Sequence, residues 1–146
     1  MKEIFIKETN ASSEDYTQLL EFRNKWLRQP LGLDLMTEDL TDDHQDFILL
    51  VMEEDEIVGC LMLHPVDDSV IKFRQMAIHP RLQGKGIGSV LMADGEQLAM
   101  EQGYSRVVLH ARQTAAPFYE KLGYQSTGNE FTEVTVPHIA MEKTLH

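Results

Sequence analysis

The sequence predicts one mixed α/β (α+β) domain built around a single sheet, in which antiparallel hairpins come first and strand–helix–strand–helix units follow. Three observations predict it: two continuous apolar runs separated by four acidic residues, a helical pattern that opens directly after a strand and three alternate glycines, and a second short helix near the carboxyl end. At 146 residues the chain is long enough to bury a core without a metal or a disulfide. We expect residues 1–146 to form this one domain.

The amino-terminal part is predicted to be a strand, a helix and a loop. Residues 4–6 are a short apolar strand between charged residues, and a serine pair caps the helix that follows. Apolar residues recur in that helix at helical spacing. Its side chains Phe22, Arg23 and Trp26 have two interpretations, core packing or the lining of a substrate cleft. Residues 29–33 then break the helix at a proline and start a loop, a candidate cover over a site.

The middle of the chain is predicted to form antiparallel strands. Residues 47–52 and 57–63 are continuous apolar runs, which is typical of strands buried on both faces. The acidic residues 53–56 between them are expected to be a solvated hairpin turn. Residues 70–78 form a further strand, which ends before Pro80 because proline lacks the donor that a ladder needs.

Helices and strands alternate in the carboxyl-terminal part. Apolar residues at helical spacing predict a helix over residues 87–102, and Gly103 is a natural stop for it. The remaining elements are a strand, a short helix and two strands, at residues 107–109, 115–122, 124–127 and 139–142.

Composition excludes several functional classes. The formal net charge of −11 argues against nucleic acid, whose phosphates an acidic protein repels, and leaves cationic substrates open. Cys60 is the single cysteine, which fits a reducing cytoplasm. No apolar run approaches the ~18 residues that span a bilayer, so we expect a cytoplasmic protein without a membrane partner. No cluster has the spacing of metal ligands.

Residues 83–88 are the segment of the sequence that most clearly indicates a binding function. A strand ends shortly before them, glycines occupy three alternate positions, and a helix opens directly. The first N–H groups of a helix lack internal partners and lie at the positive end of its dipole. Glycine lets the backbone bend tightly and admits a bulky anion, so this segment is predicted to cradle a diphosphate.

Two better-known phosphate loops do not fit this segment. A dinucleotide fingerprint needs a third glycine at the position of Ser89. A nucleoside-triphosphate loop needs Ser or Thr after its lysine, but Gly86 follows Lys85. The pattern that does fit is Gln/Arg-x-x-Gly-x-Gly/Ala.

With this pattern the sequence strongly resembles the GNAT superfamily of N-acetyltransferases. Residues 116–124 are similar to a second signature of that family, Phe/Leu-Tyr-x-x-x-Gly-Phe/Tyr, about thirty residues after the first. Residues 132–141 are similar to its ElaA-like branch, a looser match. The resemblance covers roughly residues 45–143 well and the amino-terminal third in element order only.

The resemblance implies a fold and a co-substrate. The implied sheet has an antiparallel amino-terminal half, splayed fourth and fifth strands and about four flanking helices. Acetyl-CoA is the implied co-substrate, its pantetheine pairing with the fourth strand and its diphosphate lying on the glycine loop, and no metal is implied. The implied cofactor-binding residues are Met76, Ala77, Ile78, Arg81, Gln83, Gly84, Lys85, Gly86, Ile87 and Gly88.

The implied reaction moves an acetyl group to a primary amine of a small molecule or peptide, by direct attack in a ternary complex. Tyr119 matches the general acid of the family, and a backbone N–H near Ile78 is the implied oxyanion donor. Many relatives carry a carboxylate on the fourth strand, where this chain has Arg74 and Gln75, so the base is open. The candidates are His110, Glu133, His138 and a relaying water.

Two alternatives keep the same fold without the reaction. One is a non-catalytic acyl-CoA sensor, and the other is an interaction protein whose acidic face binds a basic partner. A homodimer is also left open. The acceptor amine and the preferred acyl chain are not indicated by the sequence.

Overall fold

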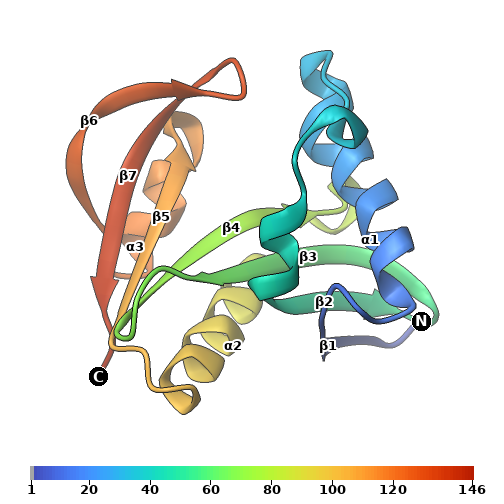
Figure 1. Cartoon of the computed structure of the whole chain (residues 1–146), viewed down its shortest axis with the longest axis horizontal. Helices are drawn as coiled ribbons and strands as arrows, with labels where there is room; N and C mark the ends of the chain where they lie inside the picture. The colour runs from blue at the N-terminus through green and yellow to red at the C-terminus, as the bar shows by residue number, and fades with distance from the viewer. Residues whose placement is uncertain (1) are drawn as a thin grey trace.

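The computed structural model describes residues 2–146 and contains seven strands: β1 (Ile4–Thr9), β2 (Phe47–Glu53), β3 (Glu56–Pro65), β4 (Val70–Ile78), β5 (Arg106–Arg112), β6 (Gln125–Glu133) and β7 (Val136–Thr144). They lie in one sheet in the order β1-β2-β3-β4-β5-β7-β6 (Figure 1). Strands β4 and β5 are parallel, and all other neighbours are antiparallel. The predicted mixed sheet with an antiparallel amino-terminal half is confirmed.

Three α-helices and several short turns connect the strands, where the resemblance implies about four helices. The helices are α1 (Asp15–Arg23), α2 (Ile87–Glu101) and α3 (Ala116–Lys121). A π-helical turn, η1 (Asn24–Arg28), continues α1, and the 3₁₀ turns are η2 (Gln29–Leu31), η3 (Leu35–Thr37), η4 (Thr41–Gln45), η5 (Pro80–Leu82) and η6 (Gln113–Ala115). No helix within residues 2–146 is long and apolar enough to cross a membrane.

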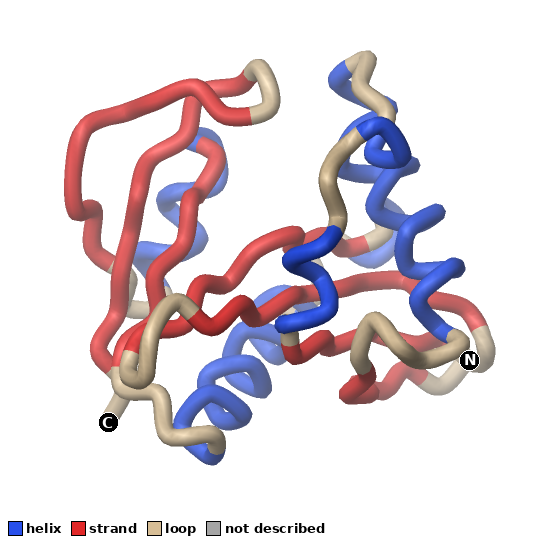
Figure 2. Tube along the Cα trace, in the orientation of Figure 1, coloured by secondary structure: helices blue, strands red, loops and turns tan. Residues whose placement is uncertain are grey.

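Apolar cores cover both faces of the sheet, because side chains alternate along each strand. In β2, Leu49 and Val51 pack in the core that α2 completes, whereas Ile48 and Leu50 pack in the core under α1. Figure 2 shows α1 and α2 on opposite sides of the central strands. The continuous apolar run at residues 47–52 is therefore a strand buried on both faces.

The sheet opens between β4 and β5. Their parallel pairing ends at Phe73 and Leu109, after which β4 continues against β3 and β5 continues against β7. A bulge follows in β4, where Gln75 has a φ of +55° and the β3–β4 register shifts. The two halves of the sheet diverge from this point (Figure 1). The predicted splaying of the fourth and fifth strands is confirmed.

The hairpin turn after β2 corrects the expectation that all of residues 53–56 lie in solvent. Glu53 is 6% exposed and accepts hydrogen bonds from the Arg81 guanidinium. These bonds hold the pKa of the Glu53 carboxyl below its usual value. The other three residues of the turn are exposed, as expected.

The carboxyl-terminal strands are longer than the sequence predicts. Strand β6 lies at the edge of the sheet and most of its residues are exposed, so it lacks the alternation that marks a half-buried strand. His110 lies within β5 rather than at its end. Glu133 and His138 lie on either side of the tight turn that joins β6 to β7.

Candidate active site

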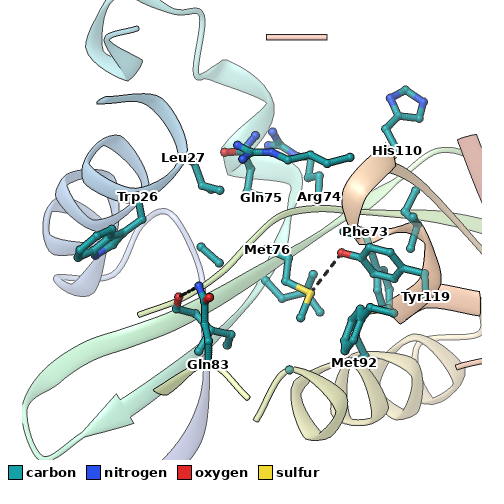
Figure 3. A pocket seen from close by; sticks show the side chains of 18 of the residues that line it. Trp26, Leu27, Phe73, Arg74, Gln75, Met76, Gln83, Met92, His110 and Tyr119 are labelled. Carbon is teal, nitrogen blue, oxygen red and sulfur yellow. Dashed lines mark hydrogen bonds between the residues drawn. The ribbon is translucent and has the colours of Figure 1, made fainter. Parts of the chain in front are cut away.

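A cleft of about 1030 Å³ opens where β4 and β5 separate. Its walls come from β4, β5, the first turn of α2, helix α3, the π-turn η1 and the turn between β6 and β7. In Figure 3, Met76 and Tyr119 lie between Gln83 and the side of the cleft that holds Arg74 and His110. The cleft therefore joins the glycine loop to the polar residues of the carboxyl-terminal strands.

The glycine loop forms an open helix end. Gly84 and Gly86 have φ values of +77° and +80°, a region that side chains disfavour, and both line the cleft. Gly86 is the N-cap of α2 and supplies no side chain to its free N–H groups. Gly88 packs so closely that a Cβ would lie 3.3 Å from Phe118. The local geometry thus leaves backbone donors free for an anion.

Eight of the ten expected cofactor residues line the cleft: Met76, Ala77, Ile78, Gln83, Gly84, Gly86, Ile87 and Gly88. The Gln83 amide nitrogen donates to the Ile78 carbonyl at 3.1 Å, which ties the loop to the end of β4. Arg81 and Lys85 do not line the cleft. The Arg81 guanidinium is engaged by Glu53, so a phosphate would compete with that carboxylate for it.

Tyr119 is held on α3 with its hydroxyl directed at β4. The hydroxyl lies 3.5 Å from the Met76 sulfur, which is a weak acceptor (Figure 3). Burial raises the pKa of Tyr119 to about 12, although the Arg112 charge acts in the opposite direction. The phenol is therefore protonated at neutral pH, and its proton is available to a stronger acceptor.

His110, Glu133 and His138 come together at the carboxyl-terminal side of the cleft. His110 Nδ1 is 3.0 Å from one Glu133 oxygen, and His138 Nε2 is 3.8 Å from the other. His138 is 4% exposed, and its Nδ1 lies 2.9 Å from the Val136 carbonyl oxygen. A carbonyl only accepts, so Nδ1 carries the hydrogen and Nε2 of the neutral ring has a free lone pair.

The turn between Glu133 and His138 is strained. Val134 and Thr135 both have positive φ, at 45° and 69°, which is unfavourable for β-branched side chains. Val134 also lines the cleft. Such backbone strain is frequent beside functional sites.

A buried ion-pair network, which no sequence pattern indicated, supports the wall of the cleft formed by β4. Asp43 accepts from Arg23 at 2.8 Å and from Arg74 at 2.7 Å, and Asp46 accepts from Arg74 at 2.9 Å. The Arg23 Nε also donates to the Gln75 side-chain oxygen at 3.2 Å. The partners are far apart in sequence, so no local pattern indicated them.

The two interpretations of the first helix each hold for part of it. Phe22 is buried in the core, and Arg23 is buried in the ion-pair network, whereas Trp26 lines the cleft. Cys60 is fully buried, and burial raises the pKa of its thiol to about 12, so it is not a nucleophile. Among the described residues no group of three or more metal-ligating side chains is arranged to hold an ion.

Comparison with known proteins gives the same family by sequence. Residues 10–145 match the family model described as acetyltransferase (GNAT) domain. The chain is 32% identical to the Bacillus subtilis protein YyaT over 97 residues, which are 66% of this chain and 65% of that protein. It is 38% identical to a second Bacillus subtilis relative over 72 residues, about half of that protein. The matches thus span half to two thirds of these relatives.

Solved structures show the same fold. Escherichia coli ElaA superimposes with a TM-score of 0.85 and 20% identity, covering 97% of this chain and 99% of that one. A GNAT family acetyltransferase from Elizabethkingia anophelis, with acetyl-CoA bound, superimposes with a TM-score of 0.71 and 19% identity, covering 97% and 98%. From its sequence and its fold, the chain belongs to the acetyltransferase (GNAT) domain family.

Proposed function

We propose that this protein transfers an acetyl group from acetyl-CoA to a primary amine by direct attack in a ternary complex. One observation carries the proposal. A single cleft contains an open helix end for a diphosphate, a buried phenol with a weak partner, and an imidazole lone pair beside a carboxylate. These groups supply the binding and the proton transfers that the reaction needs.

The amine must lose a proton before its nitrogen can attack. His138 Nε2 is the proposed acceptor, because the Val136 carbonyl fixes its tautomer. Glu133 stabilises the resulting imidazolium and attracts the incoming ammonium. His110 is a positioning residue. Its Nδ1 lies 3.0 Å from a Glu133 oxygen and 3.4 Å from the Lys72 ammonium, and this one nitrogen can form a hydrogen bond with only one of them at a time.

The departing sulfur needs a proton or a hydrogen-bond donor. The nitrogen lone pair forms the new C–N bond, and the C–S bond breaks with its electron pair remaining on sulfur. The nitrogen loses its second proton as sulfur gains one, so the proton taken by His138 is the net proton released. The Tyr119 hydroxyl already points at a sulfur atom, that of Met76, so it is placed to donate to a thiolate between β4 and α3. A backbone N–H near Ile78 is the proposed oxyanion donor, since β4 has no β5 partner there.

Release of free thiol tests the proposal. The protein is incubated with acetyl-CoA and a panel of polyamines, amino sugars, amino acids and peptides, and products are identified by mass. Thiol release that depends on the amine supports the proposal, whereas binding of coenzyme A without turnover of any amine favours a sensor. A protein that millimolar coenzyme A does not stabilise would contradict both.

Replacement of His138 locates the base. His138→Ala should lower kcat on the order of a hundredfold, because general-base catalysis contributes about that much, and should leave the stabilisation by coenzyme A unchanged. His146→Ala removes an exposed histidine outside the cleft and is the matched control. Normal turnover by His138→Ala would leave Glu133, His110 or a relaying water as the base.

A further inference from the structure

The wall of the cleft formed by β4 holds hydrogen-bond donors that no protein group uses. A guanidinium has no acceptor, so the Gln75 side-chain oxygen must face Arg23 and the amide nitrogen must face away from it. That nitrogen has no hydrogen-bond partner among residues 2–146, and neither has Nη1 of Arg74. Among residues 2–146, every buried side-chain nitrogen or oxygen has a hydrogen-bond partner. Both groups are therefore accessible, and both residues line the cleft.

Gln75 is fixed in place at a conformational cost. It has a φ of +55°, which an L-residue rarely adopts, at the bulge where β4 leaves β5. Arg23, 1% exposed, holds its side-chain oxygen, and Asp43 holds Arg23. The amide nitrogen is thus a preorganised donor rather than a mobile surface group.

The side chains that line the cleft include more cations than anions, although the whole chain is acidic. The chain has a formal net charge of −11, yet the cleft is lined by four Lys or Arg side chains and one carboxylate. The carboxylate is Glu133, beside the proposed base. Among the cations, Arg28 is paired with Glu38, and Arg74 with Asp43 and Asp46. The other two, Lys72 and Arg112, form no salt bridge with a described residue. The two cations without a carboxylate partner exceed the one carboxylate that lines the cleft, which favours an acceptor that also carries a negative group.

The cations on β4 lie on the acceptor side of the sheet. Side chains alternate along β4, so Ile71 and Phe73 pack in the core with α2, whose first turn forms the cradle. Lys72 and Arg74 point to the other face, where Arg74 meets Asp43 and Asp46. They are therefore separated by the sheet from the site proposed for the diphosphate.

We infer that Gln75 and Arg74 bind a carboxylate on the acceptor, so that the acetylated amine is an amino acid or a similar amino carboxylate. The inference rests on the proposed function and adds the class of its substrate. The acceptor ammonium lies towards Glu133 and His138, and its carboxylate receives hydrogen bonds from the Gln75 amide and from Arg74 Nη1. Lys72, whose ammonium lies 3.4 Å from His110 Nδ1, adds positive charge to the same cleft.

Matched pairs of acceptors test the inference. The panel contains α- and ω-amino acids, each beside its carboxamide, and kcat and KM are measured from thiol release. In the longer ω-amino acids the carboxyl group is too far from the nitrogen to alter its basicity. The wild-type protein should prefer the acid over the carboxamide by about tenfold or more in kcat/KM, the effect of losing a hydrogen bond to a charged group.

Gln75→Glu is the decisive variant. A carboxylate at this position still accepts from Arg23 but donates nothing and repels an anion. It should raise KM for the acid by about tenfold or more, with little change in kcat or in the KM of the carboxamide. Gln18→Glu makes the same change on the exposed side of α1, outside the cleft, and should alter neither.

The outcomes separate this inference from the proposed function. Equal turnover of acid and carboxamide by the wild-type protein overturns the inference and leaves the proposed acetyl transfer standing. An equal rise of KM for both members of a pair in Gln75→Glu shows a merely structural role and also overturns it. Absence of turnover with every amine, while coenzyme A still stabilises the protein, overturns the proposed function and this inference together.

Discussion

At the scale of single residues, Tyr119 combines burial with a weak hydrogen-bond partner. Tyr119→Phe should lower kcat on the order of a hundredfold, if the donor acts in the chemical step, without weakening the stabilisation by coenzyme A. Because burial raises the pKa of Tyr119 to about 12, the wild-type rate should not fall through pH ~10, where an ordinary phenol ionises.

Steady-state rates between about pH 7 and pH 10.5 check this prediction for Tyr119. The matched control is Tyr104→Phe, because Tyr104 lies outside the cleft. A rate that declines with a midpoint near pH 10 in the wild-type protein, and does not in Tyr119→Phe, would show that the phenol has an ordinary pKa.

Asp43 accepts hydrogen bonds from three side chains of the ion-pair network, Tyr16, Arg23 and Arg74. Burial alone would raise the pKa of Asp43, but hydrogen bonds from Tyr16 and Arg23 and the charge of Arg23 outweigh burial and hold it below its usual value. Its contribution to stability is therefore present above pH ~4 and lost as the pH falls further. Asp43→Asn should destabilise the fold by about 3–5 kcal/mol at neutral pH, because Arg23 remains buried without its partner.

Urea unfolding at about pH 7 and at about pH 2.5, below the usual pKa of an aspartate, measures this difference. The gap between wild type and Asp43→Asn should narrow at the lower pH, as the carboxylate becomes protonated. Asp42→Asn is the control, because Asp42 is the exposed neighbour and should change stability by less than about 0.5 kcal/mol. A difference that does not depend on pH would assign the effect to packing instead of charge.

At the scale of elements, the first turn of α2 depends on backbone conformation more than on side chains. Gly86→Ala places a Cβ at φ +80° in space that no protein atom occupies within 4 Å, the space assigned to the diphosphate. It should lower coenzyme A affinity at least about tenfold, because the Cβ occupies space that the diphosphate needs. The strain costs about 1–2 kcal/mol of stability.

Gly103→Ala is the matched control for the cradle. Gly103 has a φ of +91° and equally open surroundings after α2, but it does not line the cleft. The Gly103→Ala protein should lose about as much stability as Gly86→Ala but keep its affinity for coenzyme A. Thermal unfolding with and without the ligand measures both. Equal loss of affinity in both variants would mean that strain in α2, not the Cβ in the cradle, weakens binding.

Elements with strong local signals were predicted closely, and elements without them were not. The helix predicted at residues 87–102 is Ile87–Glu101, and the strand predicted at residues 70–78 is Val70–Ile78. Strand β6 was underestimated because its exposed residues show no period of two.

The candidate site likewise contains residues that local motifs indicated and residues that only tertiary contacts position. Tyr119 and the glycine loop belong to contiguous motifs, so the sequence indicated them. Gln75 acquires its orientation from Arg23, 52 residues away, and Arg23 acquires its own from Asp43. The burial of Glu53 likewise depends on Arg81, 28 residues later. Such contacts are made by the tertiary fold, and no periodicity in the chain predicts them.

At the scale of the whole molecule, the sheet consists of two halves joined by a short seam. The β4–β5 pairing comprises four residue pairs, from Val70 with Arg106 to Phe73 with Leu109, and the cleft lies beyond it. A ligand in the cleft contacts both halves of the sheet, so its contacts add to the few that join β4 to β5. The ligand should therefore raise the free energy of unfolding of the whole chain, and it should slow local opening most in the segments that it contacts.

Coenzyme A at ~100 times its dissociation constant should raise the free energy of unfolding by about 2.7 kcal/mol, seen as a higher melting temperature. Hydrogen exchange should slow most at the end of β4, residues 76–78, and in the first turn of α2, because amides there are shielded directly. The β1–β2 pair, remote from the cleft, should change only as far as it exchanges through global unfolding. Protection spread evenly over all strands, with none concentrated at the end of β4, would place the ligand outside the splayed strands and contradict the site itself.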